Sequence, residues 1–140
     1  MPSIAATPAT APVAPVARLD MGALNERKDP DRVLRFYVQA LSARQWDAAA
    51  KAWGPGAGVS AAILEAAYDR PVPPRFEIGK GTVEGAAGSL YYEAPVILRF
   101  GDEAVPERGT LTLRRVNDVD GASAEQLRWH IERSSIGAGQ

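Results

Sequence analysis

Cysteine is absent from this chain of 140 residues, and histidine occurs once. The lack of cysteine excludes disulfides, a thiolate nucleophile and Cys-ligated zinc or iron–sulfur sites, and a single histidine argues against a His-rich metal centre. No apolar run approaches the roughly 20 residues that span a bilayer. Basic blocks are also missing, since 16 Lys and Arg alternate with 17 Asp and Glu. The sequence therefore predicts no metal and no cofactor, and it disfavours nucleic acid as a partner.

The N-terminal part differs in composition from the rest. Its first 17 residues carry no charge and are mostly Ala, Pro, Thr and Val in irregular order. We expect residues 1–28 to be a flexible linker, residues 29–136 a single domain and residues 137–140 a disordered tail. Similar linkers follow the lipidated cysteine of bacterial envelope proteins, so we expect a location in the periplasm or cell envelope, or otherwise the cytoplasm. Contact with a membrane is expected only through a removed N-terminal anchor.

Three helices are predicted before residue 71. Asp29 can cap the first helix and Pro30 suits its first position, after which apolar residues recur at helical spacing to about Ser42. A second short helix is predicted over Asp47–Trp53, before a Gly-Pro-Gly stop, and a third over Ala61–Asp69 behind a Ser60 cap.

After Pro74 the apolar period changes from 3.6 to 2, which predicts strands. We expect four strands: one around Phe76 and Ile78 containing Gly79 and Gly81, one over Leu90–Phe100, one around Leu111 and Leu113, and one through Leu127, Trp129 and Ile131. Turn residues lie at 85–89, 101–106 and 117–124. Short connections indicate an antiparallel meander, so the fold class is α+β with helices packed on a curved antiparallel sheet of four or more strands.

Two stretches resemble a known superfamily. The run VLRFYVQAL at 33–41, followed by RQWDAA at 44–49, resembles the opening helices of NTF2-like (SnoaL-like) proteins, and LRWHI at 127–131 is similar to their final strand. The chain looks most like the small domains of this type in uncharacterised bacterial envelope lipoproteins. The resemblance implies a cone-shaped α+β roll that hosts isomerases, dehydratases and binding modules alike.

A ligand pocket inside the cone is one candidate site. Aromatic side chains of the helices and strands could line it, and by strand parity Arg115 points inward with Leu111 and Leu113 to meet an anionic group. The residues proposed for this pocket are Tyr37, Trp46, Trp53, Tyr68, Tyr92, Arg115 and Trp129. The same aromatics could equally form a filled core.

The sequence evidence for a catalytic site is weaker than that for a ligand pocket. His130 lies at i±2 from Arg128 and Glu132, but alternation with Leu127, Trp129 and Ile131 places it on the solvent or partner face. Steroid-isomerase-type relatives imply an inward acid beside a tyrosine, for which Asp47 and Glu93 are the candidates, although Glu93 is out of phase with the core positions.

We therefore expect a non-catalytic module, with no catalytic residues assigned, that binds a small apolar or amphipathic ligand or a protein partner. A homodimer through the outer sheet face is one expected assembly, and the side chains expected on that face are Tyr91, Ile97, Arg99, Thr110, Thr112, Arg128 and His130. The alternative is a small cofactor-independent isomerase or dehydratase that uses a pocket carboxylate and tyrosine.

Overall fold

The computed structural model describes residues 18–101 and 105–136. The helical part comprises a 3-10 helix η2 (Met21–Asn25) and the α-helices α1 (Pro30–Ser42), α2 (Trp46–Ala50), α3 (Ala61–Tyr68) and α4 (Ala124–Leu127). The strands are β1 (Arg75–Ile78), β2 (Thr82–Ala86), β3 (Ser89–Arg99), β4 (Glu107–Val116) and β5 (His130–Ser134). The fold class is thus α+β. Within the described residues no helix is long and apolar enough to cross a membrane.

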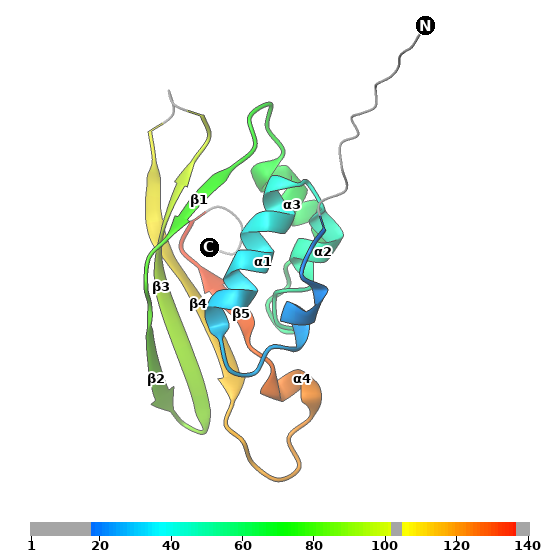
Figure 1. Cartoon of the computed structure of the whole chain (residues 1–140), viewed down its shortest axis with the longest axis vertical. Coiled ribbons are helices and arrows are strands. Elements are labelled where there is room, and N and C mark those ends of the chain that lie inside the picture. The colour runs from blue at the N-terminus through cyan, green and yellow to red at the C-terminus, as the bar shows by residue number, and fades with distance from the viewer. Residues whose placement is uncertain (1–17, 102–104, 137–140) are drawn as a thin grey trace, which may run out of the picture.

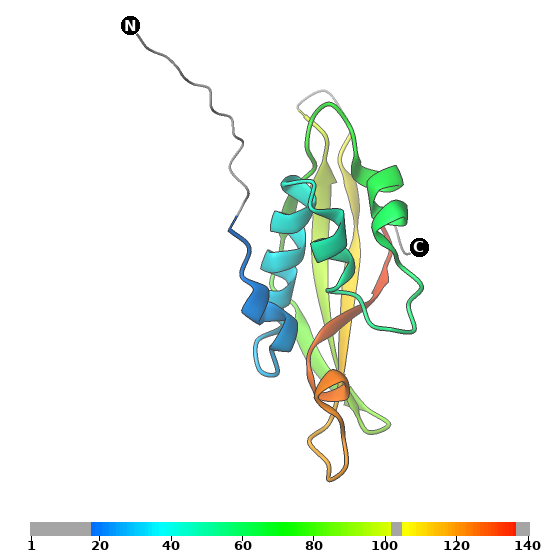
Figure 2. The same ribbon diagram turned by 90° about the vertical axis from the view of Figure 1, so that its right-hand side faces the viewer.

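The sheet is antiparallel, in the order β1-β3-β4-β5, and β2 pairs with β3 beyond the end of β1. Helices α1, α2 and α3 cover one face of this sheet, and no described helix covers the other (Figures 1 and 2). Buried residues of α1, β3, β4 and β5 fill the space between the two layers. This arrangement leaves a broad sheet face open to solvent or to a partner.

Helix α1 forms for the local reasons that its sequence suggests. The Asp29 side chain accepts a hydrogen bond from the Asp31 N–H, and Pro30 occupies the first turn. Val33, Leu34 and Tyr37 are buried on the face toward the sheet. The predicted start and end of this helix are confirmed, whereas α2 and α3 end earlier than predicted, at Ala50 and Tyr68.

The five-stranded sheet agrees with the expected four or more strands, but strand β2 was not among those predicted, because its residues are all exposed and show no alternation of burial. The last strand begins at His130, because Ser123 and Gln126 form a capping box that starts the short helix α4 and draws Leu127 into it. Gly79 and Gly81 lie between β1 and β2, not inside one strand.

Residues 18–28 are folded against the domain, although the linker prediction extended to residue 28. Arg32 of α1 binds both Asp20 and Glu26 at 2.7–2.8 Å, and the Glu26 carbonyl accepts a 2.7 Å hydrogen bond from the Trp129 N–H. Ala23 is fully buried. The predicted linker over residues 1–17 and tail over residues 137–140 lie outside the described residues.

Glu26 should make stability depend on pH in acid. The Arg32 guanidinium, together with the N–H groups of Asp29 and Lys28, lowers the pKa of Glu26 to about 2. A carboxylate with a lowered pKa stabilises the fold above its ordinary pKa, and this contribution is lost as pH falls from about 4.5 to about 2. We expect Glu26→Gln to lower the free energy of unfolding by ~1 kcal/mol at neutral pH, with the difference from wild type shrinking toward pH 2.

Urea unfolding at a series of pH values measures this effect. Glu65→Gln, at an exposed position of α3, is the matched control and should follow the wild-type curve at every pH. A constant difference between Glu26→Gln and wild type across the acid range would show that the carboxylate charge is not responsible.

Candidate functional site

Five of the predicted pocket residues lie in the core. Tyr37, Trp53, Tyr68, Tyr92 and Trp129 are each at most 5% exposed. The rings of Tyr37 and Trp53 meet edge to face with centroids 6.2 Å apart, and Tyr68 packs on Phe76 at 5.9 Å. The structure thus brings these aromatic side chains together between the helices and the sheet.

Polar atoms inside this aromatic cluster lack partners. Among the described residues, the Tyr37 hydroxyl and the indole nitrogens of Trp53 and Trp129 are buried without a well-formed hydrogen bond. The Tyr37 hydroxyl lies beside the polar ends of Trp53 and Tyr68, and burial raises its pKa well above the ordinary value of 10.0. An unpartnered buried donor costs about 1–3 kcal/mol, so these atoms are a feature to be explained.

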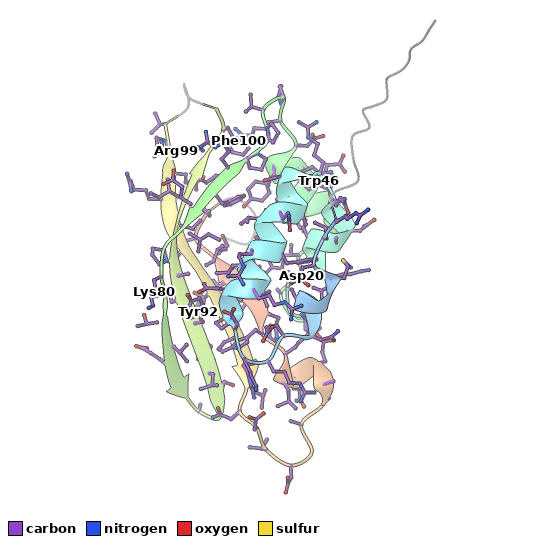
Figure 3. All side chains as sticks on the ribbon, in the orientation of Figure 1. Asp20, Trp46, Lys80, Tyr92, Arg99 and Phe100 are labelled. Atoms are coloured by element: carbon purple, nitrogen blue, oxygen red, sulfur yellow. The ribbon has the colours of Figure 1, made fainter. Side chains whose placement is uncertain are left out.

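The other two predicted pocket residues are Trp46 and Arg115. Trp46 is half-buried, packs against the core cluster and lines a shallow groove with Arg44, Lys51 and Glu65. Figure 3 shows Trp46 on the helical layer and Tyr92 between α1 and the sheet. Trp46 therefore borders the buried core without being enclosed in it.

Tyr92 and Arg115 use their polar groups to hold the fold together. The Tyr92 hydroxyl donates to Asp31 at 2.7 Å and accepts from the Gly81 N–H at 2.9 Å, which ties the start of α1 to the sheet. Burial and the neighbouring Asp31 raise the pKa of Tyr92. Arg115 is buried, as strand parity predicted, and donates to the Arg27 carbonyl and to Asp118, both at 2.6 Å.

The two acids considered for catalysis face away from the aromatic cluster. Asp47 is exposed on α2 and lines the groove beside Trp46. Glu93 is exposed on the uncovered sheet face, where it pairs across the strands with Thr82 and Thr112. The carboxylate that does meet a tyrosine hydroxyl is Asp31, which the sequence reasoning did not consider.

His130 is buried, contrary to the prediction of a solvent-facing side chain. The segment 52–54 runs beside β5, with hydrogen bonds from Ile131 N–H to the Ala52 carbonyl and from Gly54 N–H to the Ile131 carbonyl. Gly54 sits so close to the imidazole that a Cβ there would come within 2.9 Å of Nε2. Strand alternation alone could not predict the burial of His130, because the residues that cover it lie almost 80 positions earlier in the sequence.

A pocket of about 330 Å³ opens next to His130. The turn after Trp53, the end of β4, helix α4 and strand β5 form its walls, near the lower end of β5 in Figure 1. Its lining residues are Gly54, Pro55, Gly56, Ala57, Arg114, Val116, Glu125, Gln126, His130, Ile131 and Glu132. Burial, followed by the charges of Arg128 and Arg114, lowers the pKa of His130 below its ordinary 6.5, so the ring is neutral at pH 7.

The uncovered sheet face shows a charge pattern. One row of paired residues runs Thr82, Glu93, Thr112 and Arg133 across the strands, and the next runs Glu84, Tyr91, Arg114 and His130. Acids therefore stand on the β2 and β3 side, and arginines on the β4 and β5 side. Within the described part of the chain, Glu84, Glu93 and Arg133 form no ion pair.

No protein-family model matches this chain, and no curated protein matches it. A crystal structure from Thiobacillus denitrificans, provisionally assigned as a calcium/calmodulin-dependent protein kinase type II association domain, has a similar fold. The TM-score is 0.52 at 16% sequence identity, over 78% of this chain and 94% of that chain. This likeness supports an NTF2-like fold, which the sequence motifs had indicated.

Proposed function

We propose that this protein is a non-catalytic association module of the cell envelope that pairs with a second copy of itself through the uncovered sheet face. The main supporting observation is the division of charge along the two rows that start at Thr82 and Glu84, in which the acids lie on β2 and β3 and the arginines on β4 and β5. The composition of the N-terminal 17 residues supports the envelope location. The solved neighbour is itself assigned as an association domain, which is consistent with such a role for this fold.

The charge pattern is self-complementary under a two-fold rotation. If the second copy is turned about an axis parallel to the strands and lying between β3 and β4, its β5 faces β2 of the first copy. Because this rotation keeps the rows of residues level, Arg133 of each copy faces Thr82 of the other and lies one row from Glu84, within reach of its long side chain, and this contact occurs twice. Arg133 and Glu84 are exposed and unpaired in the single chain, so the interface would supply their missing partners.

The face approaches the size of a small dimer interface. Its strands contain 35 residues, and at about 4.8 Å between strands and about 3.4 Å per residue they cover roughly 570 Å² per copy. Standard interfaces bury about 800 Å² per partner. Tyr91 and Ile97 are half-buried in the middle of the face and would become fully covered, which fits the aromatic and aliphatic centre of a typical interface.

The structure changes the set of residues predicted to mediate self-association through the outer sheet face. Of the side chains expected on this surface, Thr112 and His130 are nearly inaccessible, and Arg128 lies before β5 with its guanidinium turned inward to Glu125. Tyr91, Ile97, Arg99 and Thr110 remain partly exposed. The exposed charged residues Glu84, Glu93 and Arg133 replace Arg128 and His130 as the expected polar contacts.

Charge reversal tests the dimer. We expect Arg133→Glu to raise the dimer dissociation constant at least about tenfold, because it sets an acid beside Glu84 in each of the two symmetry-related contacts. The double variant Glu84→Arg with Arg133→Glu should restore dimerisation, since it exchanges the two charges. Sedimentation equilibrium over a range of protein concentrations measures the constant for each variant.

Arg35→Glu is the matched control, because Arg35 is exposed on α1 in the helical layer. It should dimerise like the wild type. A wild-type protein that stays monomeric at high micromolar concentration would overturn the proposal, and so would a double variant that is no better than Arg133→Glu alone.

A second candidate function is binding of a small ligand within the aromatic cluster. The observation that favours it is the set of unpartnered polar atoms on Tyr37, Trp53 and Trp129, which a bound molecule with hydrogen-bond acceptors would satisfy. The close packing of Tyr37 on Trp53 leaves the dimer as the better supported proposal.

A further inference from the structure

Hydrogen bonds hold two sides of the pocket beside His130 in place. Two backbone hydrogen bonds of 2.8 and 3.0 Å fix the segment 52–54 to β5. On the other side, helix α4 begins with a complete capping box in which the Gln126 side-chain oxygen accepts from the Ser123 N–H at 2.8 Å. A ligand that enters this pocket meets groups that are already positioned, which reduces the entropy cost of binding.

Donors for an anionic group come from Arg114 and Gln126. The Arg114 Nε donates to the Ser89 hydroxyl at 3.1 Å, which holds the side chain while its terminal nitrogens stay available toward the pocket. Because the Gln126 oxygen is engaged with Ser123, its amide nitrogen is the end left for a ligand. A planar guanidinium next to an amide N–H₂ suits a carboxylate.

Acceptors for a cationic group come from His130 and Glu132. The His130 Nδ1 lies 3.3 Å from the Arg128 carbonyl, which can only accept, so Nδ1 carries the proton and Nε2 is left as an acceptor. Glu132 is two-thirds buried and stands 3.9 Å from Arg114, too far for a direct hydrogen bond. Glu125, the other acid in the wall, is already bound by Arg128.

The pocket thus combines one loosely paired cation, one loosely paired anion and a neutral acceptor. Its charged lining residues are Arg114, Glu125 and Glu132, and Arg128, which pairs with Glu125 from outside the lining, brings the formal charge of this group to zero. A ligand with a single charge would be repelled by the like charge of either Arg114 or Glu132. A small zwitterion can place an opposite charge beside each of them. Pro55, Ala57, Val116 and Ile131 form the apolar part of the lining.

We propose that this pocket binds a free α-amino acid with an aliphatic side chain. Arg114 and Gln126 hold the carboxylate, Glu132 and the His130 Nε2 accept from the ammonium group, and the side chain lies against Val116 and Ala57. The volume of about 330 Å³ is at the lower end of the usual range for ligand sites and accommodates a molecule of this size. The proposal does not depend on dimerisation.

Three related compounds test the proposal on the full-length chain: leucine, 4-methylpentanoate, which lacks the amino group, and isopentylamine, which lacks the carboxylate. Calorimetric titration should show leucine binding at least about tenfold more tightly than either probe with one charged group, since each lacks a charge-assisted hydrogen bond. No binding of leucine, valine or isoleucine at millimolar concentration would overturn the proposal.

Two variants test which side chain binds the ammonium group of leucine and which binds its carboxylate. Glu132→Gln should weaken leucine binding about tenfold and leave 4-methylpentanoate unchanged, because that probe has no ammonium group. Arg114→Met should abolish binding of leucine and of the acid while sparing the amine. Arg35→Met, which is exposed on α1 and lies outside both the pocket and the uncovered sheet face, is the control and should bind all three probes like the wild type. If the acid binds as tightly as leucine, the zwitterion assignment is wrong.

Discussion

Replacing Trp53 by alanine should lower the free energy of unfolding by about 4 kcal/mol, because truncation of a large buried aromatic leaves a cavity that the surroundings fill only in part. Trp53 is 4% exposed, packs edge to face on Tyr37 and belongs to the segment 52–54 that runs beside β5. A domain of this size has a total stability of about 5–15 kcal/mol, so the variant should be close to unfolding at physiological temperature.

Two controls separate packing from other effects. Trp53→Phe keeps most of the volume and removes the unpartnered indole N–H, so it should cost less than half as much. Trp46→Ala, at a half-buried position of α2, should cost about 1 kcal/mol. Urea unfolding followed by circular dichroism, not by tryptophan fluorescence, measures all three variants. A loss below 1 kcal/mol for Trp53→Ala would favour a hydrated pocket at this place, and with it the ligand-binding alternative.

The parts of the fold that the sequence predicts well are those with local causes. Helix α1 begins at Pro30 because Asp29, Pro30 and Asp31 are a start signal on their own, and its buried face follows directly from the spacing of Val33 and Leu34. Strand parity placed Arg115 inside for the same reason, since alternation along β4 is regular there. None of these predictions requires knowledge of the rest of the chain.

The errors arise where distant segments meet. Strand β2 has no buried alternation, and it exists because its backbone pairs with β3 from Thr82 to Ala86. Strand alternation placed His130 on the solvent face. The structure instead covers it with Gly54, a residue that lies far away in the sequence. The pocket beside it takes walls from four separate segments, so no single motif could have indicated it.

Gly81→Ala should lower the free energy of unfolding by about 2 kcal/mol, which is the usual cost when an added methyl group has no room. Gly81 lies between β1 and β2, where the chain crosses closely over β3. A Cβ at this position would collide with the Glu93 carbonyl oxygen and lie 2.7 Å from the Tyr92 ring. Because the first of these atoms is backbone, the chain itself must shift, and that shift would strain the hydrogen bond from Gly81 N–H to the Tyr92 hydroxyl.

Gly85→Ala is the matched control, since it makes the same change in β2 at a position with space. The nearest atoms to a Cβ at Gly85 are Leu90 Cδ2 at 3.8 Å and the Ser89 carbonyl oxygen at 3.9 Å, both ordinary contacts. Alanine there should leave stability unchanged or raise it by ~0.5 kcal/mol, because it restricts the unfolded chain. Urea midpoints of the two variants should therefore move in different directions from wild type, and equal midpoints would show that the crossing at Gly81 is looser than the distances indicate.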